Sequence, residues 1–266
     1  MEKRLHYDPQ LMARLTPCQS TMDGLVINPE FKKWEEYIRG NIKDRRRSYG
    51  HRYECDVDQE LLRTCQDHVQ EYSSSLTADT AVLLVHPFYL HLSHMGKLRS
   101  RRVRSDANNY LNRLFHLLSH RPSREKAGIV VLETVHHYTS VTSLLLEQKL
   151  VDGVVFTLHD DGLPLNRDDF LPFLNRRLFF GGGYNGSCFT NSLGYAVNEV
   201  HDEDDIYVIS NLVLDSPLHH VDRLRPRKII EGGSMVEPKQ DMIFPRNHLV
   251  TLERALEMMK NGESRD

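Results

Sequence analysis

The chain has 266 residues and a formal net charge of −3, with 39% hydrophobic and 27% charged residues. These proportions are typical of a soluble globular protein, and the charge gives no reason to expect general nucleic-acid binding. No apolar run approaches the roughly 18 residues that a membrane span needs, and the N-terminus lacks the apolar core of a secretory signal. The four scattered cysteines form no C-x-x-C pair, which favours reduced thiols and a cytoplasmic location.

Residues 1–75 differ in pattern from the rest of the chain and predict a helical N-terminal extension or small subdomain. Helices are expected at 30–39 and 58–72, the second because apolar residues recur there at helical spacing. Three consecutive serines at 73–75 then mark a break. An α/β ligand-binding domain is expected over residues 76–266.

From residue 80 the chain alternates apolar runs with amphipathic stretches. Buried strands are predicted at 81–85, 128–132, 153–158, 178–180 and 206–210, with helices at 105–120, 140–150, 167–174 and 188–200. This alternation indicates a parallel sheet with right-handed crossovers. The predicted fold is a doubly wound α/β domain with a mostly parallel sheet of five or six strands. After it, we expect a loop-rich stretch with an edge strand at 228–230, and a terminal helix at 247–260.

Ionisable and polar residues stand where the predicted strands end, which is the edge at which open parallel sheets bind ligands. His86 follows the first strand, Glu133 follows the second, and His159 follows the third. Asn211 follows the fifth strand. We expect His86, Glu133 and His159 to be catalytic residues and Asn211 to contact a ligand.

A glycine-rich segment follows the fourth predicted strand and matches G-x-G-x-x-G between a strand and a helix. The acidic residue expected some 20 positions further on is missing, so the segment does not indicate a dinucleotide in particular. Its backbone amides suit a small anionic ligand or a nucleotide. The expected binding residues are Gly181, Gly182, Gly183, Tyr184, Asn185, Gly186 and Ser187. The structural alternative is a tight turn between strand and helix.

Cys188 begins the helix predicted after this segment. At a helix N-terminus a thiolate is stabilised by the helix dipole and by unpaired amides, so Cys188 is a candidate nucleophile. Its partners would be the acid–base residues at the other strand ends. The alternative is a small buried residue where the helix packs on the sheet.

The cysteine segment resembles that of a known enzyme family. Gly182-x-x-Asn185-x-x-Cys188, followed by Ser192 and Ala196, is similar to the corresponding segment of isochorismatase-like cysteine hydrolases. The resemblance implies a nucleophilic cysteine, an aspartate at the end of the first strand and a lysine at a later strand end. In this chain a histidine stands at the first of those positions, and no lysine lies at the intervening strand ends.

Two further patterns leave alternatives open. Several residues are of types that bind divalent metals such as Zn²⁺ or Mn²⁺, namely His86, Glu133, His136, His159, Asp160 and Asp161. A basic stretch over 97–104 suits an anionic ligand or nucleic acid, or is a solvated start of a helix. It contains Lys97, Arg99, Arg101, Arg102 and Arg104.

The favoured function is a hydrolase that acts on a small anionic metabolite or nucleotide. The alternatives are a non-catalytic nucleotide-binding or regulatory module and a metal-dependent hydrolase. A divalent metal is an open question, as are the substrate and the oligomeric state. A membrane partner is not expected.

Overall fold

A parallel sheet forms the centre of the molecule. The computed structural model describes residues 28–45, 59–94, 101–157, 162–173, 175–185, 188–199, 205–215, 229–231, 234–236 and 248–262. Within these residues the sheet has six strands, β1 (Thr80–Val85), β2 (Gly128–Glu133), β3 (Gly153–Phe156), β4 (Arg177–Gly182), β6 (Ile206–Ile209) and β10 (Leu249–Val250). Every neighbouring pair is parallel. The predicted doubly wound α/β fold is confirmed.

The order of the strands is β10-β6-β4-β1-β2-β3. From β1 the chain moves outward to β2 and β3, returns to β4 on the other side of β1, and continues to β6 and β10. The direction of winding therefore reverses between β1 and β4, where Val85 pairs with Gly182. Folds of this kind bind ligands outside the carboxyl ends of the strands at such a reversal. The carboxyl ends of β1 and β4 are thus the place where a site is expected.

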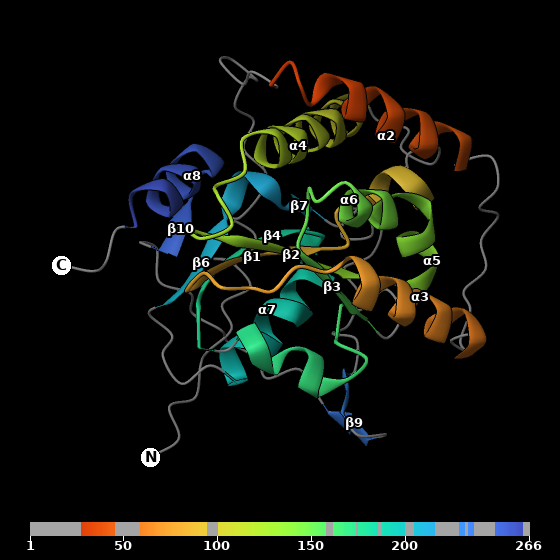
Figure 1. Ribbon diagram of the computed structural model, residues 1–266, viewed down its shortest axis with the longest axis vertical. Helices are drawn as coiled ribbons and strands as arrows, with labels where there is room; N and C mark the ends of the chain where they lie inside the picture. Colours follow the sequence, from red (N-terminus) through yellow and green to blue (C-terminus); the bar gives the residue numbers. More distant parts are fainter. Residues whose placement is uncertain are drawn as a thin grey trace.

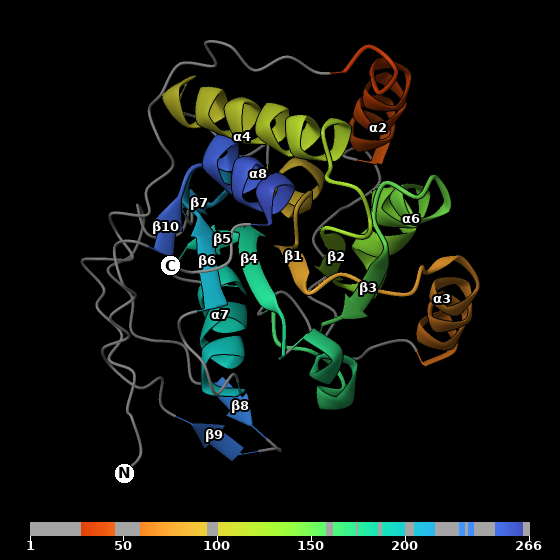
Figure 2. The ribbon, with the colours of Figure 1, turned by 60° about the vertical axis from the view of Figure 1, so that its left-hand side comes forward.

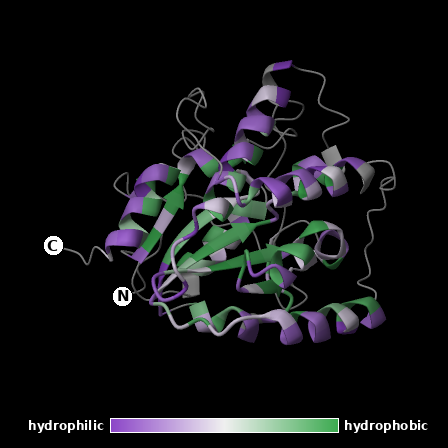
Figure 3. Ribbon diagram, turned by 45° about the horizontal axis from the view of Figure 1, so that its top comes forward, coloured by the Kyte–Doolittle hydropathy of each residue, from purple (hydrophilic) through white to green (hydrophobic). Residues whose placement is uncertain are grey.

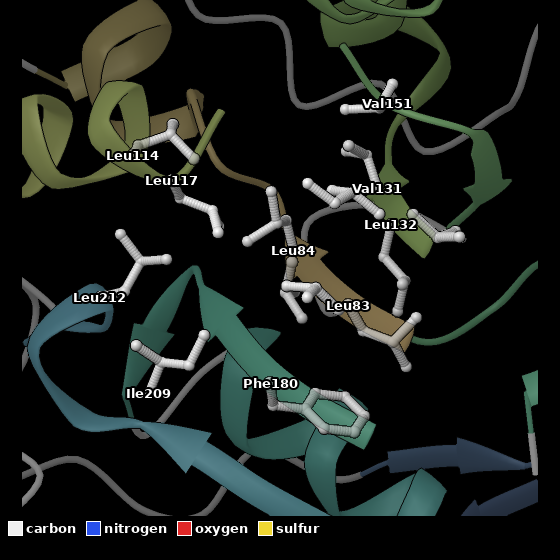
Figure 4. Packing of buried hydrophobic residues seen from close by; sticks show 14 of the residues in the cluster. Leu83, Leu84, Leu114, Leu117, Val131, Leu132, Val151, Phe180, Ile209 and Leu212 are labelled. Carbon is white, nitrogen blue, oxygen red and sulfur yellow. The ribbon is translucent and has the colours of Figure 1, made fainter. Parts of the chain in front are cut away.

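Helices cover both faces of the sheet. α4 (Arg101–Ser119), α6 (Ser143–Glu147) and α8 (Leu252–Asn261) lie on one face and α7 (Cys188–Glu199) on the other (Figures 1 and 2). The strands are apolar along their length and the outer faces of the helices are hydrophilic (Figure 3). Leu114 and Leu117 of α4 reach toward Leu84 of β1 in the core (Figure 4). None of the described helices has the length and apolar character needed to cross a membrane.

Two helices from the N-terminal part of the chain, α2 (Lys32–Arg45) and α3 (Gln59–Tyr72), pack on this domain. The ring of Phe31, just before α2, lies 5.8 Å from that of Phe115 in α4, and the guanidinium of Arg39 covers the same ring. In α3, Nδ1 of His68 lies 2.5 Å from the hydroxyl oxygen of Tyr138. The buried residues of both helices belong to one continuous core with the sheet. The division of the chain near residue 75 stays a prediction.

Three predicted elements are wrong in form. The short helix expected at 167–174, with an interruption or kink at Pro172, is two 3₁₀ turns, Arg167–Asp169 and Leu171–Phe173, and Pro172 lies in the second. The helix expected at 247–260 starts only at Leu252, after β10, where the Thr251 hydroxyl caps its first turn. The strand expected at the sheet edge is β8 (Ile229–Glu231), which instead pairs with β9 (Ser234–Val236) in a separate antiparallel hairpin. A further short parallel pair joins β5 (Tyr184–Asn185) to β7 (Leu214–Asp215).

Candidate functional site

The end of β1 carries a histidine with an unusual backbone. His86 has φ of 40°, in the left-handed region that residues with a Cβ rarely adopt. Its Nε2 lies 2.8 Å from the hydroxyl oxygen of Thr157, which follows β3, and its backbone N–H donates to the carbonyl of Leu132 in β2. His86 therefore joins the carboxyl ends of three strands, and strained residues of this kind gather at functional sites.

Two glycines bring the end of β4 against β1 and against Cys188. Gly182 has φ of 83°, and a Cβ there would lie 2.5 Å from the carbonyl oxygen of Val85. Gly183 has φ of 64°, and a Cβ there would lie 3.0 Å from Sγ of Cys188. A larger residue at either position would be strained and would collide with its neighbour. Packing alone therefore accounts for glycine at both positions.

Cys188 is the first residue of α7, and it is only 2% exposed. Its Sγ accepts a hydrogen bond from the backbone N–H of Tyr184 at 3.3 Å. The amide and the helix N-terminus favour a negatively charged sulfur, whereas burial opposes it. One turn further, the Ser192 hydroxyl lies 2.6 Å from the carbonyl oxygen of Gly162 and 3.0 Å from that of Cys188. The segment that follows β3 is thereby fixed against the start of α7.

Tyr110 of α4 reaches the same place from the other face of the sheet. Its buried hydroxyl donates a hydrogen bond to the carbonyl of Pro87 at 3.0 Å, in the segment after β1. Burial raises the pKa of Tyr110 far above its ordinary value, and nearby Cys188 and Glu133 add to this, whereas the N–H of Gly183 acts in the opposite direction. Tyr110 is therefore a neutral phenol within electrostatic range of both the sulfur and the carboxylate.

The ring of Tyr89 lies between two other rings, those of Tyr184 and of a histidine in the helical turn that follows β2. This half-buried ring meets the ring of Tyr184 edge-on at a centroid distance of 6.1 Å, and that of His137 edge-on at 4.9 Å. It also lies 6.1 Å from the ring of His86. Burial raises the pKa of Tyr184 well above its ordinary value, and Cys188 is the next largest cause. Tyr184, like Tyr110, is thus a neutral phenol beside the sulfur.

The chain after β2 folds around the carboxylate of Glu133. The helix predicted at 140–150 begins earlier, as α5 (Val135–His137), continues as a π-helical turn, Tyr138–Thr142, and ends as α6. Glu133 is 0% exposed, and its carboxylate accepts the backbone N–H of Thr134 at 3.0 Å and the hydroxyl of Thr142 at 3.2 Å. Nδ1 of His137 lies 3.6 Å from the same carboxylate. Single π-helical turns are frequent at functional sites, and this one places Thr142 on Glu133.

The structure brings three of the four predicted catalytic residues, His86, Glu133 and Cys188, to the carboxyl edge of the sheet. Thr157 and the ring of Tyr89 lie beside His86, and Tyr110 lies within electrostatic range of Glu133 and Cys188. The fourth, His159, lies outside the described residues, as do Gly186 and Ser187 and the side chain of Asn185. The joint catalytic role of these residues stays a prediction.

Asn211 stands at the same edge but is tied to a helix. Its Oδ1 accepts the backbone N–H of Leu252 at 2.9 Å, and its Nδ2 lies 3.5 Å from a carboxylate oxygen of Glu253. These contacts cap the start of α8. The ligand contact expected for Asn211 stays a prediction, and its observed partners have a structural role.

The metal alternative receives no support from the part of the chain that is described. There, no three His, Cys, Asp or Glu side chains are grouped so that they could hold a metal ion. Three of the six candidate ligands, His159, Asp160 and Asp161, lie outside the described residues. So do Lys97 and Arg99 of the basic stretch.

Three residues of the site were not predicted from the sequence. Tyr110 fits the apolar stripe of its helix, so that its spacing suggests only a core residue. His137 forms a sequence pair with His136, and only the early start of the helix, at Val135, shows which of the two lies one turn from Glu133. Tyr89 lies shortly after the predicted first strand. This position near a strand end was the signal in the sequence that could have placed it at the site.

The chain was compared with protein-family models, with curated proteins and with solved structures, and none of them matches it. The function is therefore inferred from the geometry alone. That geometry combines a sulfur at a helix N-terminus, neutral phenols near that sulfur, and a buried carboxylate beside an imidazole.

Proposed function

We propose that the protein is a hydrolase that acts on a small anionic metabolite or nucleotide, with the thiol of Cys188 as the nucleophile. The observation that carries the proposal is the position of its sulfur. Sγ of Cys188 accepts the N–H of Tyr184 at the first residue of α7, beside the reversal of strand order. An amide donor and a helix N-terminus together are what lower the energy of a thiolate.

Hydrolysis is favoured over redox chemistry because the dinucleotide signature is missing from its usual place. In doubly wound nucleotide-binding folds the glycine-rich turn follows the first strand, at the N-terminus of the first helix. Here β1 is followed by His86, Pro87 and Phe88. A thiol, a carboxylate and an imidazole suffice for acyl transfer to water without a bound cofactor.

The anionic part of the ligand would bind at the first turn of α7. The first N–H groups of a helix have no partner within it and carry partial positive charge. The amide of Tyr184 donates to Cys188, and that of Gly183 faces the hydroxyl of Tyr110. These two amides of the glycine segment thus face protein groups and not a ligand. Of the predicted binding site at 181–187, we therefore propose the end next to α7 as the part that binds the anion.

A non-catalytic ligand-binding module is the second candidate, and two observations favour it. Cys188 is almost completely buried, and Gly182 and Gly183 are explained by close packing. In that case the cysteine is a small core residue at the junction of helix and sheet. The two candidates differ in how reactive the thiol is.

Alkylation with iodoacetamide across a pH series, followed for each cysteine by peptide mass spectrometry, separates them. Cys65 is a matched internal control because it is also buried, is not at a helix N-terminus, and has a pKa raised by burial. If Cys188 is activated, its alkylation reaches half its maximal rate below the ordinary cysteine value of pH ~8.5 and runs well ahead of Cys65.

Coinciding profiles for Cys188 and Cys65 would rule out the nucleophile. A thermal-shift screen with nucleotides and small carboxylic acids then tests the binding module, since a ligand that binds the folded state raises the melting temperature. Stabilisation without thiol reactivity would support the module, and the Cys188→Ser variant should show the same shift.

A further inference from the structure

We infer that α3, from the N-terminal part of the chain, controls the conformation of the carboxyl edge through the π-helical turn Tyr138–Thr142. The two ring nitrogens of His68 in α3 bind the first residue of this turn and a residue beyond its end. Thr142, the last residue of the turn, donates a hydrogen bond to Glu133. The coupling is a property of the fold, and its effect on a reaction rests on the proposed function.

His68 forms a bridge across the turn with both of its nitrogens. Its Nδ1 lies 2.5 Å from the hydroxyl oxygen of Tyr138, and its Nε2 lies 3.1 Å from Oε1 of Glu147 in α6. A carboxylate accepts hydrogen bonds, so Nε2 donates to Glu147. Burial raises the pKa of Tyr138, with further contributions from Cys65 and Glu147, so its hydroxyl keeps its proton and donates to Nδ1. One nitrogen of His68 therefore donates and the other accepts.

Aromatic contacts hold the imidazole and the phenol in place. The ring of His68 stacks on that of Tyr72 at a centroid distance of 4.6 Å and meets that of Tyr138 edge-on at 5.9 Å. Tyr138 also meets the ring of Phe156, at the end of β3, edge-on at 5.2 Å. Tyr138 is buried, so the loss of His68 would leave its hydroxyl in the interior without this partner. The bridge thus joins α3, the turn and β3 in one cluster.

The bridge is specific for the π-helical register of the turn. The N–H of Ser143 donates to the carbonyl of Tyr138 five residues earlier, whereas in an α-helix it would donate to the carbonyl four residues earlier. If the turn relaxed to an α-helix, the residues after it would rotate by about 100° relative to Tyr138, the angle of one residue. Tyr138 and Glu147 could then no longer both meet His68. His68 therefore favours the π-helical turn over the more common α-helical one.

The register of the turn decides which groups surround Glu133. The Thr142 hydroxyl donates to its Oε2 at 3.2 Å, and both residues are completely buried. The other oxygen accepts the N–H of Thr134, which precedes the turn and does not depend on its register. Loss of the π-helical turn would move Thr142 away and take this donor from Oε2. α3 therefore acts on the carboxylate that we expect in the site, although it lies outside the sheet domain predicted from the sequence.

The other N-terminal helix, α2, has a similar position. α6 lies between α2 and α3 (Figures 1 and 2), and α2 also packs against the turn. α2 further packs against a second π-helical turn, Leu90–His94, which follows β1. The two nitrogens of His68 bind Tyr138 and Glu147, so this second turn provides an internal reference for changes at His68.

Amide hydrogen exchange of the full chain, followed by mass spectrometry, tests the inference. His68→Phe keeps an aromatic ring beside Tyr72 and Tyr138 but lacks both nitrogens, and Tyr138→Phe removes only the hydroxyl. Because either change breaks the bridge, both should speed exchange in residues 138–147 about tenfold, as expected for the loss of one buried hydrogen bond. Exchange in Leu90–His94 and in β6 should stay as in the wild type.

Thr64→Ala is a matched control in the same helix. It removes an exposed hydroxyl that donates to the carbonyl of Glu60 within α3, so it changes the helix without touching the bridge. Exchange in residues 138–147 should therefore be that of the wild type.

A double-mutant cycle tests the link from His68 to Glu133. Thr142→Val removes the donor to the carboxylate and keeps the shape of the side chain. In the wild type it should lower the folded-to-unfolded ratio, measured by urea unfolding, about tenfold, because the lost bond is to a charged group. In a His68→Phe background the donor has already moved, so the same change should lower the ratio by less than about threefold.

Neither measurement involves the reaction, so the outcomes separate this inference from the proposed function. Unchanged exchange in residues 138–147 in both His68→Phe and Tyr138→Phe overturns the inference, as does an equal rise in β6 or in Thr64→Ala. An equal cost of Thr142→Val in both backgrounds also overturns it. An unreactive Cys188 contradicts the proposed nucleophile and leaves the coupling in place. If His68→Phe does not fold, Tyr138→Phe carries both measurements.

Discussion

Two buried carboxylates lie at opposite edges of the sheet, and their partners differ in kind. Asp152 precedes β3 at the amino edge, where its oxygens lie 2.7 Å from Nη2 of Arg121 and 2.9 Å from Nε of Arg124. It also accepts the backbone N–H of Ile129 in β2 at 2.8 Å. Glu133, at the carboxyl edge, meets a backbone amide, a hydroxyl and a histidine.

The difference separates a carboxylate held by two arginines from one held by neutral donors beside a histidine. Arginine stays protonated at every pH at which the protein folds, so the pairing of Asp152 is permanent. Arg121 also donates to the carbonyls of Lys149 and Leu150, which joins the end of α6 to the same cluster. Glu133 has a backbone N–H, a hydroxyl and an imidazole around it in place of guanidinium groups.

The largest effect on stability is expected at the amino edge. Asp152→Asn keeps the shape but removes the charge, and it leaves two arginines without their carboxylate, so the free energy of unfolding should fall by about 3 kcal/mol. In Glu133→Gln the free energy of unfolding should fall by only about 1 kcal/mol, because two of the partners of Glu133 are neutral donors. Urea unfolding at neutral pH measures both.

A surface pair provides the control for this comparison. Glu257→Ala removes the partner of Arg254 from an exposed ion pair and should change stability by less than about 0.5 kcal/mol. If Asp152→Asn and Glu133→Gln lose the same free energy of unfolding, the proposed difference between the two edges of the sheet is wrong.

A second variant tests the close contact between the glycine segment and the sulfur. Gly183→Ala places a Cβ 3.0 Å from Sγ of Cys188 at φ of 64°, so both strain and collision should lower the free energy of unfolding by about 2 kcal/mol. Gly262 has nearly the same φ, 61°, with nothing within 4 Å of an added Cβ. Gly262→Ala should therefore show the strain alone, about 1 kcal/mol.

A double-mutant cycle measures the part of this cost that is due to the sulfur. The added Cβ would also lie 3.1 Å from Cβ of Phe189 and 3.2 Å from the carbonyl oxygen of Val85, and these contacts remain in any background. In a Cys188→Ala background Gly183→Ala should therefore cost less than in the wild type, by at most about 1 kcal/mol. The same cost in both backgrounds would show that the glycine does not act through Cys188. Chemical denaturation of the four proteins gives all the values needed.

The parts of the fold that the sequence predicted are those with an unbroken local pattern. β1 and β2 are buried along nearly their whole length, and a continuous apolar run indicates such a strand directly. β10 is only two residues long, and Leu249 fits the helical spacing of Leu252 and Leu256, so a single helix was the simpler interpretation. A two-residue strand takes its form from its neighbour β6, which no local pattern can show.

The residues of the candidate site also divide into those with a local sequence signal and those without one. The placement of His86, Glu133 and Cys188 at one edge was predictable because the end of each strand is visible in the sequence and parallel strands share an edge. The position of Tyr110 was not, because it depends on a contact across the fold. The hydroxyl of Tyr110 reaches a carbonyl of the segment after β1 from the middle of α4. His137 was missed for a local reason, because the helix was expected to begin at residue 140 and in fact begins at Val135.

One polar residue at the carboxyl edge does not fit the distinction. Asn211 caps α8 by accepting the N–H of Leu252, so Asn211→Ala should lower the free energy of unfolding by about 1 kcal/mol. Thr251→Ala removes another cap of the same helix, the hydroxyl that accepts the N–H of Arg254, and should cost a similar amount.

The alkylation profile of Cys188 then decides which role Asn211 has. If Asn211 serves only the helix, both variants leave the rate and the pH profile of Cys188 unchanged, because the loss is confined to the start of α8. A change in Asn211→Ala that is absent from Thr251→Ala would place Asn211 in the site, as the sequence predicted. The carboxyl edge contains both kinds of residue, and only a chemical readout at the sulfur separates a cap from a ligand-binding group.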